Sequence, residues 1–72
     1  MKYAVIFERT QSGWSAHVPN LPTILVTRTP ELGAMRARVA SAIAFHVAGL
    51  REDGEPVPEA TTNVEEIEAP AA

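Results

Sequence analysis

The fold is decided by residues 13–22, which read GWSAHVPNLP. Gly13 can adopt the positive backbone angle that a tight turn needs, and alternating side chains then follow until two prolines end the run. The preceding residues 3–8 show the same period of two, which is typical of a half-buried strand. We therefore expect the chain to open with a β-hairpin whose turn lies at residues 10–13.

Two further elements follow the hairpin. Residues 23–29 are rich in β-branched side chains and predict a third strand. Thr29 and Pro30 are typical of a helix N-cap and first helical residue, so a helix should begin near residue 30 and end before Gly54. Six apolar residues recur at helical spacing and should face the sheet: Leu32, Met35, Val39, Ile43, Val47 and Leu50.

Residues 55–63 follow the helix and cannot be helical, because they include Pro56 and Pro58. Residues 63–67 are interpreted as a short fourth strand at the edge of the sheet. The predicted fold class is therefore α+β: a three-stranded antiparallel sheet with one helix packed on it and a short fourth edge strand (β-β-β-α-β). We expect one domain over residues 1–68 and a disordered tail over residues 69–72.

Composition restricts the class of function. Six basic residues oppose nine acidic ones, the net charge is −3, and seven of the acids follow Arg51. This distribution argues against strong binding to duplex nucleic acid; it suits either a basic partner or simple solvation of the tail. Cysteine is absent, which excludes disulfides and thiol chemistry. With no apolar run near 20 residues and no signal peptide, we expect a cytoplasmic protein without a membrane partner.

No residue pattern predicts catalysis. His17 should point from its strand toward solvent or a partner, and His46 should lie at the edge of the apolar helix stripe, where a packing role is the commoner one. The carboxylates fall into no metal-binding spacing, and no nucleophile motif or phosphate loop occurs. We therefore expect neither enzymatic activity nor a cofactor or metal.

The outer face of the predicted helix is small and apolar where charged residues are usual. One interpretation is that alanine is the best helix former and this face needs nothing more. The other interpretation is that this face forms an interface. A domain of 72 residues buries little surface alone, so self-association into a dimer or tetramer would stabilise it. The candidate interface residues are Ala37, Ser41, Ala44, Phe45 and Ala48.

Three segments together resemble the HicB antitoxin family: KYAV at residues 2–5, GWSAHVPNLP at 13–22 and DGEPVP at 53–58. The resemblance covers roughly residues 1–60. It implies a partial ribonuclease H-like or double-stranded-RNA-binding-like fold. Ribonuclease H activity is not expected from it, because the strands supply only Glu8 where clustered carboxylates would be needed.

The resemblance also implies a function, the binding and neutralisation of a small HicA-type toxin that cleaves messenger RNA with a histidine. The antitoxin would cover the toxin's RNA-binding or catalytic surface. Acidic residues suit that task, and the candidates for contact are Asp53, Glu55, Glu59, Glu65 and Glu66, with Glu68 beside them. Longer antitoxins of this kind add a C-terminal DNA-binding segment that this sequence lacks, so direct DNA binding is not expected. The alternative function is a stand-alone oligomeric scaffold or binding module without a toxin partner.

Overall fold

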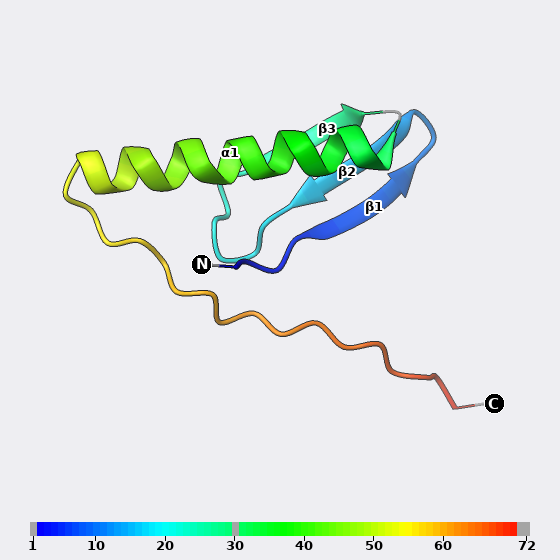
Figure 1. Ribbon diagram of the computed structural model, residues 1–72. Coiled ribbons are helices and arrows are strands. Elements are labelled where there is room, and N and C mark those ends of the chain that lie inside the picture. The colour runs from blue at the N-terminus through cyan, green and yellow to red at the C-terminus, as the bar shows by residue number, and fades with distance from the viewer. Residues whose placement is uncertain (1, 30, 71–72) are drawn as a thin grey trace.

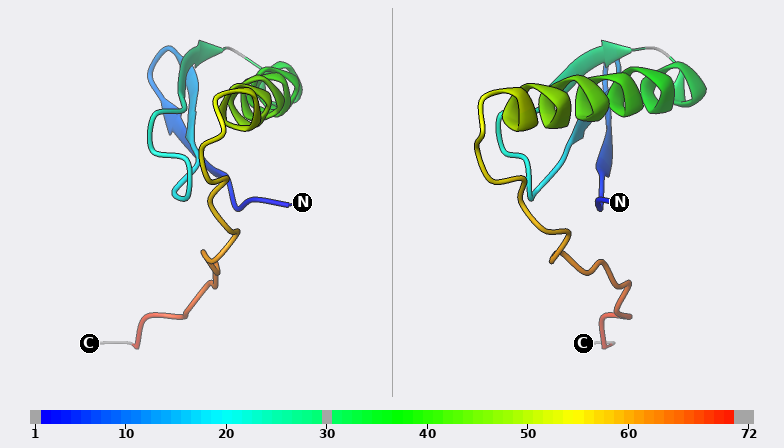
Figure 2. Two further views of the ribbon diagram at one scale, coloured as in Figure 1. Left: turned by 90° about the vertical axis from the view of Figure 1, so that its left-hand side faces the viewer. Right: turned by 60° about the vertical axis from the view of Figure 1, so that its left-hand side comes forward.

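A computed structural model describes residues 2–29 and 31–70 as a sheet with one long helix lying across it (Figure 1). Views turned about the vertical axis separate the two layers and show the C-terminal segment leaving them (Figure 2). Strand β2 lies between its neighbours in the order β1-β2-β3. The elements are β1 (Ile6–Thr10), β2 (Gly13–His17), β3 (Leu25–Thr29) and α1 (Leu32–Glu52).

The predicted hairpin is confirmed. Strands β1 and β2 pair antiparallel from Ile6 opposite His17 to Thr10 opposite Gly13, with two residues left for the turn. Gly13 has a φ of 135°, a conformation that other residues rarely adopt. The Thr10 hydroxyl donates a hydrogen bond of 3.1 Å to the Gly13 carbonyl oxygen and closes the turn.

The predicted fold class is wrong. Only β1 and β2 form an uninterrupted two-stranded ladder; β3 joins β2 with a shift in register between Trp14 and Ala16. The expected fourth edge strand is not formed: residues 63–67 belong to no strand, and all of them are exposed. Their pattern explains this outcome: Val64 and Ile67 are three positions apart, so a strand would direct them to opposite faces.

Helix α1 begins two residues later than predicted. Its N-cap is Glu31, in an extended conformation, and no side chain caps the helix. Thr29 does not serve as the cap because it is still part of β3, where it lies opposite Trp14. Pro30, the expected first helical residue, lies outside the described residues.

The hydrophobic core lies between α1 and the sheet. The predicted apolar stripe of α1 faces the sheet, but only Met35 and Val39 are buried, whereas Ile43 and Val47 are half-buried. The second half of the helix therefore extends past the core. The buried residues are Ala16, Val18, Leu21, Ile24, Val26, Met35 and Val39.

The C-terminal end of α1 is fixed by a turn that needs glycine. The Gly54 N–H donates to the Arg51 carbonyl at 3.1 Å, and the Glu55 N–H donates to the Leu50 carbonyl at 2.8 Å. These two bonds form a Schellman motif, in which the residue after the cap is left-handed. Gly54 fills that position with a φ of 70° and directs the chain away from the helix axis.

Substitution of two glycines tests this turn. Gly54→Ala should lower the free energy of unfolding by about 1–2 kcal/mol, because an L-residue is disfavoured in the left-handed region. The matched control Gly49→Ala lies within the helix and should raise it by up to about 1 kcal/mol. Neither new Cβ would meet an atom within 4 Å, so the backbone conformation decides whether each substitution raises or lowers the free energy of unfolding. Urea denaturation measures both changes. If the two substitutions changed the free energy in the same direction, the left-handed turn at Gly54 would be contradicted.

Candidate functional site

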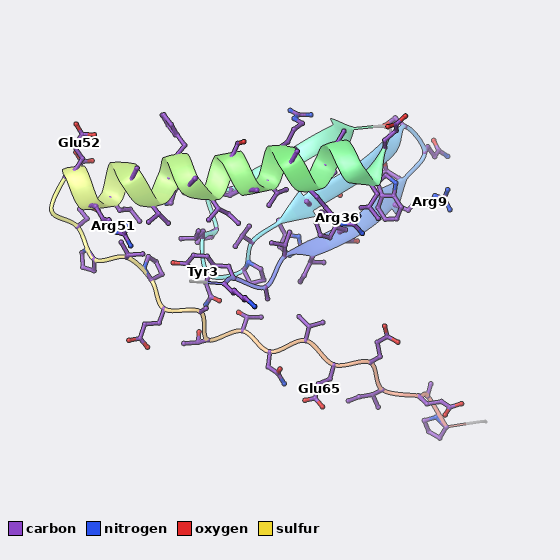
Figure 3. The ribbon with its side chains drawn as sticks, in the orientation of Figure 1. Tyr3, Arg9, Arg36, Arg51, Glu52 and Glu65 are labelled. Atoms are coloured by element: carbon purple, nitrogen blue, oxygen red, sulfur yellow. The ribbon has the colours of Figure 1, made fainter. Side chains whose placement is uncertain are left out.

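The acidic residues predicted to bind a partner lie along one extended segment. Asp53 is the C-cap of α1, and the chain after Gly54 runs without regular structure away from the body of the protein (Figure 1). All five predicted contact residues are exposed, but they do not converge on a single cluster. We call residues 53–68 the acidic arm, and Figure 3 shows Glu65 on its outer part.

Three hydrogen bonds attach the middle of the acidic arm to the body. The Tyr3 hydroxyl donates to the Pro58 carbonyl oxygen at 2.5 Å. Asn20 then makes two bonds: its Nδ2 donates to Thr61 Oγ1 at 2.9 Å, and its Oδ1 accepts from the Thr62 N–H at 3.2 Å. The path of the arm is therefore set as far as Thr62.

The two anchoring residues, Tyr3 and Asn20, could not be predicted from the sequence. Tyr3 and Asn20 each bind residues more than 40 positions away in the chain, and no local pattern indicates such a pairing. Asn20 lies between two prolines, and this position alone was typical of a turn. The role of both residues follows only from the path of the arm.

Beyond Thr62 every residue of the arm is exposed. A bond of 3.0 Å from Asn63 Nδ2 to Glu65 Oε2 is local to the arm. Two apolar side chains alternate with the acids there: Val64 is 62% exposed and Ile67 is 88% exposed. This part of the arm thus presents negative charge and apolar surface together.

The outer face of α1 is also exposed along its whole length. We call Ala34, Ala37, Ser41, Ala44 and Ala48 the alanine face; each of these five residues is exposed. Phe45 lies beside this face with 84% of its surface accessible, although phenylalanine is among the residues most often buried. All five predicted interface residues thus lie together on one exposed side of the helix.

A groove of about 350 Å³ borders the other side of the alanine face. Tyr3 forms its far wall, and Arg51 lies at its end near the C-terminus of α1; both side chains are on the same side of the helix in Figure 3. The remaining lining is aliphatic: Ala40, Ile43, Ala44, Val47 and Ala48. The groove is where the second half of α1 extends past the core.

The histidines and the tryptophan are divided between β2, which holds Trp14 and His17, and α1, which holds His46. His17 and His46 are both half-buried, and they lie on different elements of the fold. Among residues 2–29 and 31–70, no three His, Asp or Glu side chains are grouped to hold a metal ion. Trp14 is half-buried against the core, with the Arg9 guanidinium 5.7 Å from its ring centroid. The expectation that the protein is not an enzyme stays a prediction.

The protein exposes more surface than its mass requires. A compact monomer of 7.7 kDa exposes about 4,300 Å², whereas this chain exposes 5721 Å². Its radius of gyration is 14.4 Å, compared with about 11 Å for a compact domain of this length. The acidic arm and the overhanging half of α1 account for this open shape, and both are surfaces that a partner can cover.

Comparisons with known proteins add no relative. No family model matches the sequence, and neither a curated protein nor a solved structure is significantly similar to it. The resemblance to the HicB family therefore stays a prediction from the three motifs. Within the described part of the chain, α1 is the one long helix, and it is not apolar enough to cross a membrane.

Removal of the anchors should release the arm and leave the core unchanged. In Asn20→Ala, the Thr62 amide should exchange with solvent about fivefold faster, because a hydrogen bond of about 1 kcal/mol is lost. Tyr3→Phe should likewise speed amide exchange at the residues around Pro58. Hydrogen exchange followed by NMR measures this effect.

The matched control for the anchors is Thr10→Val, which removes a hydrogen bond of the same kind in the hairpin turn. It should leave exchange at Thr62 unchanged. If Asn20→Ala also left the Thr62 amide unchanged, the arm would not be anchored as described.

Proposed function

We propose that this protein is an antitoxin-like inhibitor that binds a small HicA-type toxin and covers its RNA-binding or catalytic surface. The observation that carries the proposal is the acidic arm: its acidic residues are exposed, and its middle is held by Tyr3 and Asn20. The three motifs that resemble the HicB family support the same function. In this proposal the protein acts by binding and catalyses no reaction itself.

The physical basis is electrostatic. A ribonuclease must attract the phosphates of RNA, so its substrate surface carries basic residues. Of the nine acidic residues, seven follow Arg51 and lie on or next to the arm. A negative arm speeds the encounter with a basic surface, and the apolar Val64 and Ile67 provide contact area once the surfaces meet.

A preset path favours the arm as a binding element. A free tail loses conformational entropy when it binds, and this loss weakens the complex. The hydrogen bonds at Pro58, Thr61 and Thr62 restrict the first part of the arm before any partner arrives. Only the outer residues, from Asn63 onward, would still be ordered on binding.

The second candidate is a stand-alone oligomeric module without a toxin. The observation that favours it is the exposed alanine face with Phe45 beside it, which an inhibitor acting through the arm leaves unused. The two candidates differ in whether the purified chain inhibits a ribonuclease: the module self-associates but inhibits none. The gene neighbourhood also distinguishes the two candidates, because the gene of an antitoxin is expected beside a short reading frame that encodes a basic protein.

The test of the antitoxin function takes as candidate toxin a small basic protein encoded beside this chain. Co-expression should relieve the growth arrest that the toxin causes, and the purified chain should inhibit RNA cleavage in vitro. Glu65→Gln combined with Glu66→Gln should lower the association rate by roughly tenfold at low salt, with the difference shrinking as salt screens the charges. Stopped-flow fluorescence measures this rate.

The matched control is Glu8→Gln combined with Glu31→Gln, which removes the same charge from exposed residues of the folded body. It should change the association rate much less. Equal effects of the two pairs would show that the arm is not the contact. Continued growth arrest with soluble chain present would remove the antitoxin function altogether.

A further inference from the structure

The groove beside α1 is apolar but is not filled by the chain that forms it. Its walls are Tyr3 and aliphatic side chains of α1 from Ala40 onward, with Arg51 at one end. The acidic arm passes beside the groove, where Pro58 accepts a hydrogen bond from Tyr3, but no residue of the arm lines the groove. The groove is therefore open to an occupant from another molecule.

Phe45 has the properties of such an occupant. It is 84% exposed and points away from the groove of its own chain, because consecutive helical residues differ by about 100° and Phe45 follows the groove residue Ala44. A cavity of about 150 Å³ is enough to hold a benzene ring. The groove, at about 350 Å³, has room for the phenyl ring of a second copy.

The arrangement around α1 allows a reciprocal fit. The groove lies on one side of the alanine face and Phe45 on the other. A two-fold axis parallel to the helix brings the Phe45 side of each copy against the groove side of the other. Because the two helices then run in the same direction, Phe45 meets its partner at the height of the partner's Ala44, within the groove.

Small side chains make the close approach possible. The alanine face lies between Phe45 and the groove, and its residues allow two helix backbones to come near each other. The spacing of Ala37, Ser41, Ala44 and Ala48 alternates between four and three, which is the spacing of residues at a helix–helix seam.

Charge supports the same arrangement at the end of the helix. Arg51 lies at the groove and Glu52 points to the opposite side of α1 (Figure 3). The parallel axis therefore brings Glu52 of each copy beside the partner's Arg51. Two pairs of opposite charges then face each other across the interface. An antiparallel pairing would place these residues at opposite ends of the interface.

The exposed area is sufficient for such an interface. A standard interface buries about 800 Å² on each partner. The chain exposes about 1,400 Å² more than a compact monomer of its mass, on the basis of the usual scaling of surface with mass. The exposed surface includes the acidic arm and the outer face of α1.

We propose that the groove of each chain receives Phe45 of a second copy, in a homodimer whose two α1 helices pack in parallel through the alanine face. This inference stands apart from toxin binding, because it concerns the purified chain alone. Two independent features carry it: an unfilled apolar groove, and an exposed aromatic ring placed to fill the groove of a neighbour.

Single cysteines test the direction of the helices. The natural chain has no cysteine, so Ala37→Cys and Ala48→Cys each introduce one thiol on an exposed position. In the parallel dimer each variant alone should form a disulfide with its own copy under mild oxidation, seen on non-reducing gels. In an antiparallel dimer the two like positions lie about 16 Å apart, beyond the reach of a disulfide, and only a mixture of the two variants cross-links.

Substitution of Phe45 tests the occupant. Phe45→Glu should convert the dimer to a monomer in light scattering, and it should leave the far-ultraviolet circular dichroism unchanged because the residue is exposed. The matched control is Val64→Glu, which changes an exposed apolar residue on the arm and should leave the dimer mass unchanged. A wild-type monomer at millimolar concentration, a dimer that survives Phe45→Glu, or cross-links in the mixture only would each overturn the proposal.

Reversal of charge at the end of α1 gives a further check. Arg51→Glu alone and Glu52→Arg alone should each raise the dissociation constant of the dimer roughly threefold to tenfold, because each leaves like charges facing one another. The double substitution should restore the affinity, since it exchanges the two charges and keeps them opposite. Analytical ultracentrifugation measures these constants, and a double variant no tighter than either single one would contradict the pairing.

Discussion

The packing of the first half of α1 on the sheet is the contact on which the rest of the molecule depends. Met35 and Val39 are buried there against Ala16, Val18 and Val26 of the sheet side. The strands have five residues each, about 17 Å, whereas the 21 residues of α1 extend for about 31 Å. A helix of this length cannot be covered by so short a sheet, so its second half projects beyond the core.

That mismatch of lengths creates both candidate surfaces. The projecting half of α1 leaves Ile43 and Val47 half-buried and opens the groove that Tyr3 borders. It also carries the Schellman turn at Gly54 past the edge of the sheet, so the acidic arm starts far from any strand it could pair with. The arm returns to the body only through the hydrogen bonds of Tyr3 and Asn20. The same geometry thus produces an open helix face and a displayed acidic segment.

Local physical rules predicted the parts of this fold that depend on neighbours in sequence. The hairpin follows from alternation and from Gly13, and the sheet-facing stripe of α1 follows from helical periodicity around Met35 and Val39. The fourth strand failed because residues 63–67 have β-branched residues without the period of two that a strand requires. The predicted interface residues lie on one exposed side of α1 and the predicted contact residues lie on the arm, but whether these surfaces bind a partner stays a prediction. The groove and the anchors were not predicted, because they depend on Tyr3 and Asn20 lying beside residues far away in the chain, which no local pattern encodes.

The two proposed surfaces are compatible and reinforce each other. Pairing through α1 uses the alanine face, Phe45 and the groove, whereas toxin binding uses the arm beyond Thr62; the described structure places these on different parts of the molecule (Figure 1). In a parallel dimer both Gly54 turns lie at the same end, so two acidic arms leave the pair side by side. A basic partner that engages one arm then meets the second at high effective concentration, because the arms are tethered to one body. Each arm alone has mostly exposed charges, which contribute little singly in water. Doubling the arms through the dimer therefore strengthens the binding of a basic surface without any new contact in the arm itself.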